Sequence, residues 1–133
     1  MISTKSMTAE MQTCIEISTD CQKMCIETIN YYKGSKCIDI TLMCMMRDCA
    51  KMSAMCINMI MDGSEFMGRT CEICAEMCER LAVACQAINN DAKIVELALF
   101  SRKCAQSCKQ MGRMSDSYFR RSNFVTEDTL LMG

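Results

Sequence analysis

The chain contains no histidine, no proline and no tryptophan, and it has only five glycines. The absence of histidine removes the side chain that most often acts as a general base or activates a nucleophile, so the common enzyme chemistries are disfavoured. The absence of proline, together with few glycines, indicates long uninterrupted elements with few turns. We therefore expect the 133 residues to form one all-helical domain.

Excess charge and long apolar runs are also absent. The net charge of -1 gives no basic field that would attract nucleic acid. No apolar run reaches the roughly 18 residues that a membrane span requires. The N-terminal stretch "MISTKSMTAEMQTC" lacks the apolar segment of a signal peptide. We expect no nucleic-acid or membrane partner and a cytoplasmic location, where thiols stay reduced.

Breaks in the sequence divide the chain into four helices. Gly34 and Gly63 end the first two, and "NND" separates the last two. The predicted helices cover about 4-32, 36-61, 65-88 and 91-118. Because the links are short, the expected fold is all-α, an up-down-up-down antiparallel four-helix bundle formed by residues 1-118. Residues 119-133 have no clear period and are interpreted as a loose tail or a partner-docking segment.

The abundant residues are cysteine and methionine, with 13 and 16 copies. In the third helix the cysteines follow steps of three, four and seven residues, which places them on one inward face. The same rule, with a broader stripe on the second helix, predicts a Cys-lined core that includes every cysteine. The candidate metal ligands are Cys14, Cys21, Cys25, Cys37, Cys44, Cys49, Cys56, Cys71, Cys74, Cys78, Cys85, Cys104 and Cys108.

The abundance of inward-facing thiols has several possible explanations. Free cysteine packs as a small apolar residue, but a core built of it would be undersized. An odd number of cysteines excludes a complete disulfide set within one chain. Zinc knuckles and iron–sulfur sites use compact sets of ligands, often in loops, whereas soft thiolates without imidazole select Cu(I). The pattern favours multiple Cu(I) ions in the core; a general soft-metal (Zn/Cd) buffer of metallothionein type and a disulfide or redox-active interaction protein remain alternatives.

Methionines gather at one mouth of the predicted bundle. This mouth combines the start of the first helix, the end of the second, the start of the third and the end of the fourth. We hypothesise that thioethers there, which hold Cu(I) less firmly than thiolates, pass or cap copper; the alternative is that they fill irregular gaps in the core. Hydrocarbon side chains close the opposite end. The auxiliary ligands would be Met7, Met11, Met52, Met55, Met59, Met67, Met111 and Met114.

The acidic residues do not suggest an enzyme site. Glu16, Glu72 and Glu76 fall off the inward faces, as expected for a solvated surface. A di-iron bundle would need inward glutamates and Glu-x-x-His, which a chain without histidine cannot supply. We therefore expect a protein that is not an enzyme.

The stretch "GSEFMGRTCEICAEMCERLAVAC" resembles the third-helix region of the copper storage proteins, the Cys-rich four-helix-bundle family of bacteria. The spacing from Cys25 to Cys37 to Cys44 and the late pair Cys104 and Cys108 are similar to the same family, so the resemblance covers roughly residues 14-111. It implies Cu(I) held mainly between two thiolates, a homotetramer, and proximity to the cytosolic members. A copper chaperone is a candidate partner.

The chain departs from that family at the end of the bundle opposite the methionines. Cytosolic members usually carry histidine near the loops that join helices one to two and three to four. Here those places hold Tyr31, Tyr32 and "NNDAKIVELALF". Leu81, Ile94 and Leu97 stand where the family often has further cysteines. This end is therefore expected to differ from the family in how it admits and holds copper.

Overall fold

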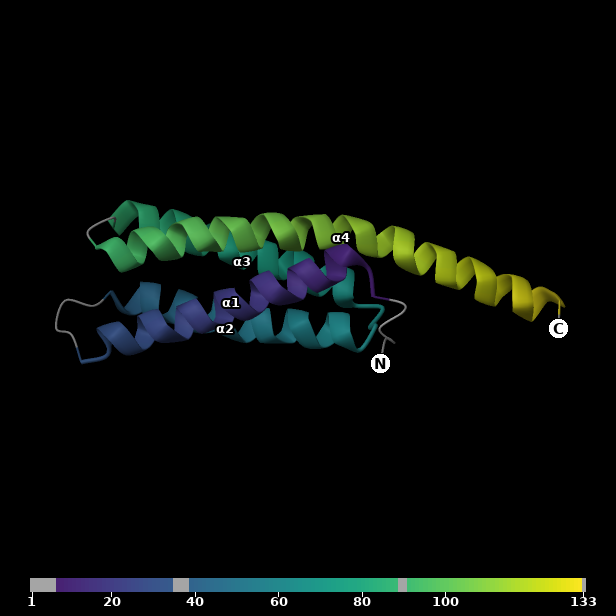
Figure 1. Cartoon of the computed structure of the whole chain (residues 1–133), viewed down its shortest axis with the longest axis horizontal. Coiled ribbons are helices and arrows are strands. Elements are labelled where there is room, and N and C mark those ends of the chain that lie inside the picture. The colour runs from purple at the N-terminus through teal and green to yellow at the C-terminus, as the bar shows by residue number, and fades with distance from the viewer. Residues whose placement is uncertain (1–6, 35–38, 89–90, 133) are drawn as a thin grey trace.

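The computed structural model describes residues 7-34, 39-88 and 91-132, with side-chain surroundings up to Ser115. Four antiparallel helices form the bundle that the sequence predicts (Figure 1): α1 (Ala9–Tyr32), α2 (Ile40–Met61), α3 (Met67–Ile88) and α4 (Ala92–Met132). Each helix packs against its two neighbours, in the order α1, α2, α3, α4 and back to α1. No strand occurs within the described ranges.

Side-chain caps and left-handed glycines set most of the helix boundaries. The Thr8 hydroxyl accepts a hydrogen bond from the Met11 amide, and the Asp39 carboxylate accepts one from the Leu42 amide. Gly34 and Gly63 have φ values of 89° and 65°, in the region that glycine adopts without strain. The second helix thus begins at Ile40 and not near residue 36. The predicted start of the first helix, near residue 4, lies outside the described residues.

The last helix is longer than predicted. It was expected to end near residue 118, yet α4 continues as one helix to Met132. In Figure 1 its C-terminal part projects beyond the end of the bundle where the N-terminus lies. The expectation of a loose segment after residue 118 was therefore wrong. A partner-docking role for this segment stays a prediction.

Small residues bring α3 and α4 close together. A Cβ atom on Gly68 would lie 3.5 Å from the Gly112 carbonyl oxygen, so the two backbones meet at these glycines. The same faces carry buried alanines at intervals of seven residues, Ala75 and Ala82 on α3 and Ala98 and Ala105 on α4. The close approach places the cysteines of these two helices beside one another.

The two contact glycines are expected to differ in their tolerance of alanine. At Gly68 a Cβ would lie 3.0 Å from the Ser115 Cβ, which the backbone fixes, whereas at Gly112 it would meet the flexible Glu72 side chain at 2.9 Å. Alanine gains about 1 kcal/mol of helix propensity over glycine at either position. We expect Gly112→Ala to leave the free energy of unfolding unchanged or raised, and Gly68→Ala to lower it by about 1 kcal/mol through overpacking. Urea unfolding of the reduced protein measures both; equal effects would contradict this packing.

Within the described residues no helix is long and apolar enough to cross a membrane. The four helices instead bury an interior made largely of sulfur-bearing side chains.

Candidate metal centre

The bundle interior is lined with thiols. Of the described cysteines, eleven are at most 1% exposed. Cys44 is the exception, because it is exposed on α2, so the expectation that it faces the core was wrong. Cys37 lies outside the described residues. The buried thiols are Cys14, Cys21, Cys25, Cys49, Cys56, Cys71, Cys74, Cys78, Cys85, Cys104 and Cys108.

Three groups of sulfur atoms are compact enough to hold a metal ion. Within each group all Sγ atoms lie within 4.8 Å of one another, and every member is buried. The groups are Cys14, Cys56 and Cys108; Cys21, Cys78 and Cys104; and Cys74, Cys104 and Cys108. Cys104 and Cys108 each belong to two of them, so the groups form a connected series along the core.

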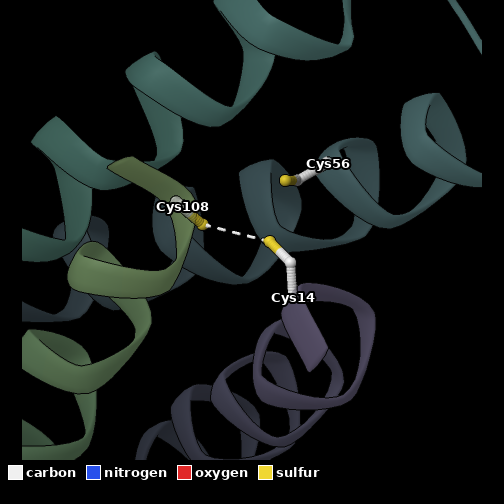
Figure 2. Close-up of side chains that lie close together, drawn as sticks. All are labelled: Cys14, Cys56 and Cys108. Carbon is white, nitrogen blue, oxygen red and sulfur yellow. Dashed lines mark hydrogen bonds between the residues drawn. The ribbon is translucent and has the colours of Figure 1, made fainter. Parts of the chain in front are cut away.

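Figure 2 shows the first group, in which sulfurs from α1, α2 and α4 point toward a common centre. The Sγ atoms of Cys14 and Cys108 are 3.9 Å apart. Cys71 adds a sulfur atom from the remaining helix, α3, because its Sγ lies 3.1 Å from that of Cys56. Side chains from all four helices therefore converge at this level, so an ion bound there would tie the helices together.

Each group contains one thiol that is stabilised as a thiolate. Hydrogen bonding from Cys108 holds the pKa of Cys14 far below its ordinary value, and Cys104 does the same for Cys21 and for Cys74. Hydrogen bonding with Cys108, and then with Cys14, raises the pKa of Cys56. Hydrogen bonding with Cys104, and then with Cys21, raises the pKa of Cys78. In each group one thiol is therefore available to a metal ion as a thiolate, and the other thiols must lose their protons when they bind it.

Cys85 and Cys25 are also held in the protonated form. Burial raises the pKa of Cys85 to about 11, with a smaller contribution from the nearby Cys49 charge. Desolvation and the Cys21 hydrogen bond also raise the pKa of Cys25, the hydrogen bond being the larger cause. Copper reaching this part of the core would release a proton for each thiolate that it binds.

Buried serines interrupt the thiol lining. Ser18, Ser53 and Ser101 are each fully buried on α1, α2 and α4. The Ser18 hydroxyl lies 3.9 Å from the sulfurs of both Cys14 and Cys108, and the Ser53 hydroxyl lies 3.9 Å from that of Cys74. The Ser101 hydroxyl has no hydrogen-bond partner. A hydroxyl is a hard, weak ligand for Cu(I), so these positions lower the thiol density while still supporting neighbouring thiolates.

Helix α2 presents a different face from the one predicted. Its buried positions are Leu42, Met46, Cys49, Ala50, Ser53, Cys56 and Ile60. Met52 and Met59, which were predicted as auxiliary ligands at the mouth, are only half-buried. Ser53 and Met46 were missed, although steps of four and three residues counted from Cys49 lead to both of them.

The predicted role of the methionines at one mouth stays a prediction, and the structure gives the burial of each side chain. Met11 and Met67 are fully buried and Met111 is 2% exposed, so these three side chains lie at the end of the thiol lining. Met7, Met52, Met59 and Met114 are half-buried against the core. Met55 is 46% exposed and lies outside the buried core. At the opposite end Ile94 and Leu97 are buried, and Tyr32, Ile88 and Phe100 pack against the core, as the hydrocarbon closure requires.

Comparisons with known proteins agree with this arrangement. The chain is 29% identical over 108 residues to the uncharacterized cysteine-rich protein YhjQ of Bacillus subtilis strain 168, covering 75% of this chain and 94% of the relative. Among solved structures, apo-Csp3 (copper storage protein 3) from Bacillus subtilis matches with a TM-score of 0.70 and 25% identity, covering 76% of this chain and 97% of that one.

Two further structures share the fold. The Nmul_A1745 protein from Nitrosospira multiformis matches with a TM-score of 0.70 and 25% identity, over 79% of this chain and 96% of its own. The Cu(I)-bound copper storage protein BsCsp3 matches with a TM-score of 0.71 and 24% identity, over 77% of this chain and 98% of its own. Nearly the whole of each neighbour is covered, so the shared fold is the complete bundle of those proteins.

A four-helix bundle whose interior is a series of buried thiol groups defines a class of helical proteins that can hold soft metal ions. The sequence places the chain more narrowly. The family model described as copper storage protein matches residues 2–113, and the chain belongs to that family. The matched region ends before the part of α4 that projects from the bundle.

Proposed function

We propose that this protein binds and stores multiple Cu(I) ions inside its bundle through cysteine thiolates. The observation that carries the proposal is the connected series of three buried thiol groups, in which Cys104 and Cys108 are shared. Cu(I) accepts two or three sulfur ligands, and a bridging thiolate can serve two ions. A series with shared thiols therefore suits a chain of Cu(I) ions better than it suits isolated tetrahedral sites.

A zinc or cadmium buffer is the second candidate, and the site chemistry favours it less. Tetrahedral zinc would require four thiolates around each ion, with two negative charges left on each complete site. Such charge is costly in an interior without a buried cation, and the buried polar residues of the described core are serines and threonines. A linear Cu(I) site leaves one negative charge, and thiolates shared between two ions lower the charge for each ion further.

The family and the composition also support a proposal about the setting of this function. We infer a non-enzymatic protein that acts in the cytoplasm, assembles as a homotetramer and receives copper from a donor such as a chaperone. A free thiol interior of this kind persists only in a reducing compartment. The candidate ligands are the eleven buried cysteines together with Cys37; the exposed Cys44 lies outside the series.

Isolation from copper-supplemented cells tests the storage function. The tagged chain is purified under anaerobic conditions, and copper and zinc are counted per chain by elemental analysis. We expect several copper ions for each chain, with zinc far below copper. The matched control replaces Cys104 and Cys108 by serine and should retain much less copper. Copper at or below one ion per chain, or zinc in equal number, would overturn the proposal.

The buried methionines are proposed to cap the copper series at the mouth. Met11, Met67 and Met111 are neutral soft ligands at the end of the thiol lining, and they bind Cu(I) less tightly than thiolates do. We expect Met11→Leu, Met67→Leu and Met111→Leu together to slow Cu(I) uptake while total capacity stays nearly constant, because leucine preserves the volume. Stopped-flow uptake kinetics provide the measurement. Uptake at the wild-type rate would assign these residues to packing alone.

A further inference from the structure

The C-terminal part of α4 lies outside the bundle that holds the thiols. Ser115 is only 2% exposed, so α4 still packs against the bundle at that residue. Residues 116–132 continue the helix and project beyond the bundle end where the N-terminus lies (Figure 1). The family match ends at residue 113. Copper storage in the core therefore does not explain this projecting helix, residues 116–132.

The projecting helix has a sequence that forms a helix poorly on its own. Aspartate, serine, asparagine, threonine, valine and aromatic residues, all of modest helix propensity, make up most of it. An isolated helix of about 15 residues is marginal in water even when its sequence is rich in alanine. A helix of this composition needs packing against another surface, and that surface lies outside the bundle of its own chain (Figure 1).

The charges of the projecting helix are divided along its length. Arg120 and Arg121 precede Phe124, and Glu127 and Asp128 follow it. At 3.6 residues per turn, all four positions fall within about 60° of position 124 around the helix axis. The basic pair and the acidic pair therefore share one side of the helix. Two such helices repel each other when they run parallel and attract each other when they run antiparallel.

The register of an antiparallel pair follows from this pattern. A two-fold axis at Phe124 sets Arg120 level with Asp128 of the second copy. By the same symmetry, Arg121 lies level with Glu127 of the second copy. Each basic position is thus matched with an acidic one, and each match occurs twice.

The length of the projecting helix gives the same register independently. An axis at position 124 sets residue 116 level with residue 132, so the overlap is the whole of the projecting helix. Position 124 is therefore the midpoint of the charge pattern and also of the segment that leaves the bundle. Because the overlap stops before Ser115, the two bundles face each other end to end without a collision.

We propose that two copies of this protein associate through their projecting helices, which pair antiparallel about Phe124. The occupant of this surface is a second copy of the chain, because two arginines followed by two carboxylates complement the same pattern in the reverse direction. The inference goes beyond copper storage, and it gives the proposed homotetramer one of its interfaces.

Charge reversal tests this pairing. One variant carries Arg120→Glu and Arg121→Glu, and the other carries Glu127→Arg and Asp128→Arg. Each replaces attraction between the helices by repulsion, so we expect the dissociation constant for self-association to rise at least about tenfold. Sedimentation of the full-length reduced protein over a series of concentrations measures it. An equimolar mixture of the two variants should associate as the wild type does, because opposite charges meet again.

The matched control is Lys23→Glu with Lys51→Glu, which changes the net charge as the first variant does, at exposed positions of α1 and α2. It should associate as the wild type does. Circular dichroism checks that each variant is folded. A monomeric wild-type chain, wild-type association of both folded variants, equal weakening by the control, or a mixture that does not associate would overturn the pairing.

Copper binding separates this inference from the storage function. Both charge variants keep every cysteine, so anaerobic titration should give them the wild-type number of Cu(I) ions. A wild-type chain that associates as described but accumulates no more than one ion would overturn storage and leave the pairing intact. Loss of ions in the charge variants would show that these positions act on the bundle interior, which contradicts a role confined to pairing.

Discussion

Replacing Cys104 and Cys108 together by serine is expected to remove at least about one Cu(I) ion from each chain and to weaken the binding of others, because Cys74 is left alone in its group and the other two groups each lose a ligand. Serine keeps nearly the same volume, so the bundle should remain folded while a hard hydroxyl takes the place of the soft sulfur. Anaerobic Cu(I) titration of the reduced variant, with the bound ions weighed by native mass spectrometry, measures the loss.

Cys44→Ser is the matched control for this experiment. Cys44 is exposed on α2 and belongs to none of the three groups, so its replacement should leave the number of bound ions unchanged. An equal loss in the double variant and in Cys44→Ser would mean that copper binds to accessible thiols at the surface and not in the core.

Loading with Cu(I) is expected to raise the midpoint of thermal unfolding by at least about 20 °C. A ligand at about 1,000 times its dissociation constant adds about 4 kcal/mol for each site that only the folded state offers. In a domain of this size each kcal/mol shifts the midpoint by roughly 4 °C, so even two such sites exceed that value. The first group joins α1, α2 and α4, so the bound ion also holds separate helices together.

Differential scanning calorimetry of the reduced protein before and after Cu(I) addition measures this shift. Removal of copper by a strong Cu(I) chelator should return the midpoint to its starting value. The same addition to the Cys104→Ser, Cys108→Ser double variant should give a smaller shift. A midpoint that does not respond to Cu(I) would contradict binding between the helices.

The helical period of the sequence was sufficient to predict the architecture and most of the lining. Proline-free segments broken at Gly34 and Gly63 gave the four helices, and the inward faces of α1, α3 and α4 agree with the observed burial at every predicted cysteine. This success has a simple physical basis, since a long amphipathic helix with short links has one face that it can bury.

The errors on α2 arose from requiring every cysteine to face inward. Steps of four and three residues from Cys49 lead to Met46 and Leu42 in one direction and to Ser53, Cys56 and Ile60 in the other, and all of these are buried. Cys44 lies off that series and is exposed. The regular period was a better guide to the buried face than residue type.

Two further features could not be predicted from the periodicity of single helices. Which thiols from different helices meet, such as Cys56 with Cys71, depends on the vertical offset between helices that the links and the Gly68–Gly112 contact impose. The continuation of α4 to Met132 carries no periodic apolar face that would have predicted it.

The central claim is that the thiol lining holds a series of Cu(I) ions, and parallel anaerobic titrations of the reduced protein with Cu(I) and with Zn(II) test it most directly. Native mass spectrometry counts the ions on each chain. The account predicts more than three tightly held Cu(I) ions, approaching roughly one for each buried cysteine, with zinc bound in smaller number and displaced by copper. Saturation at one or two Cu(I) ions, or zinc that matches copper in number and resists displacement, would contradict it.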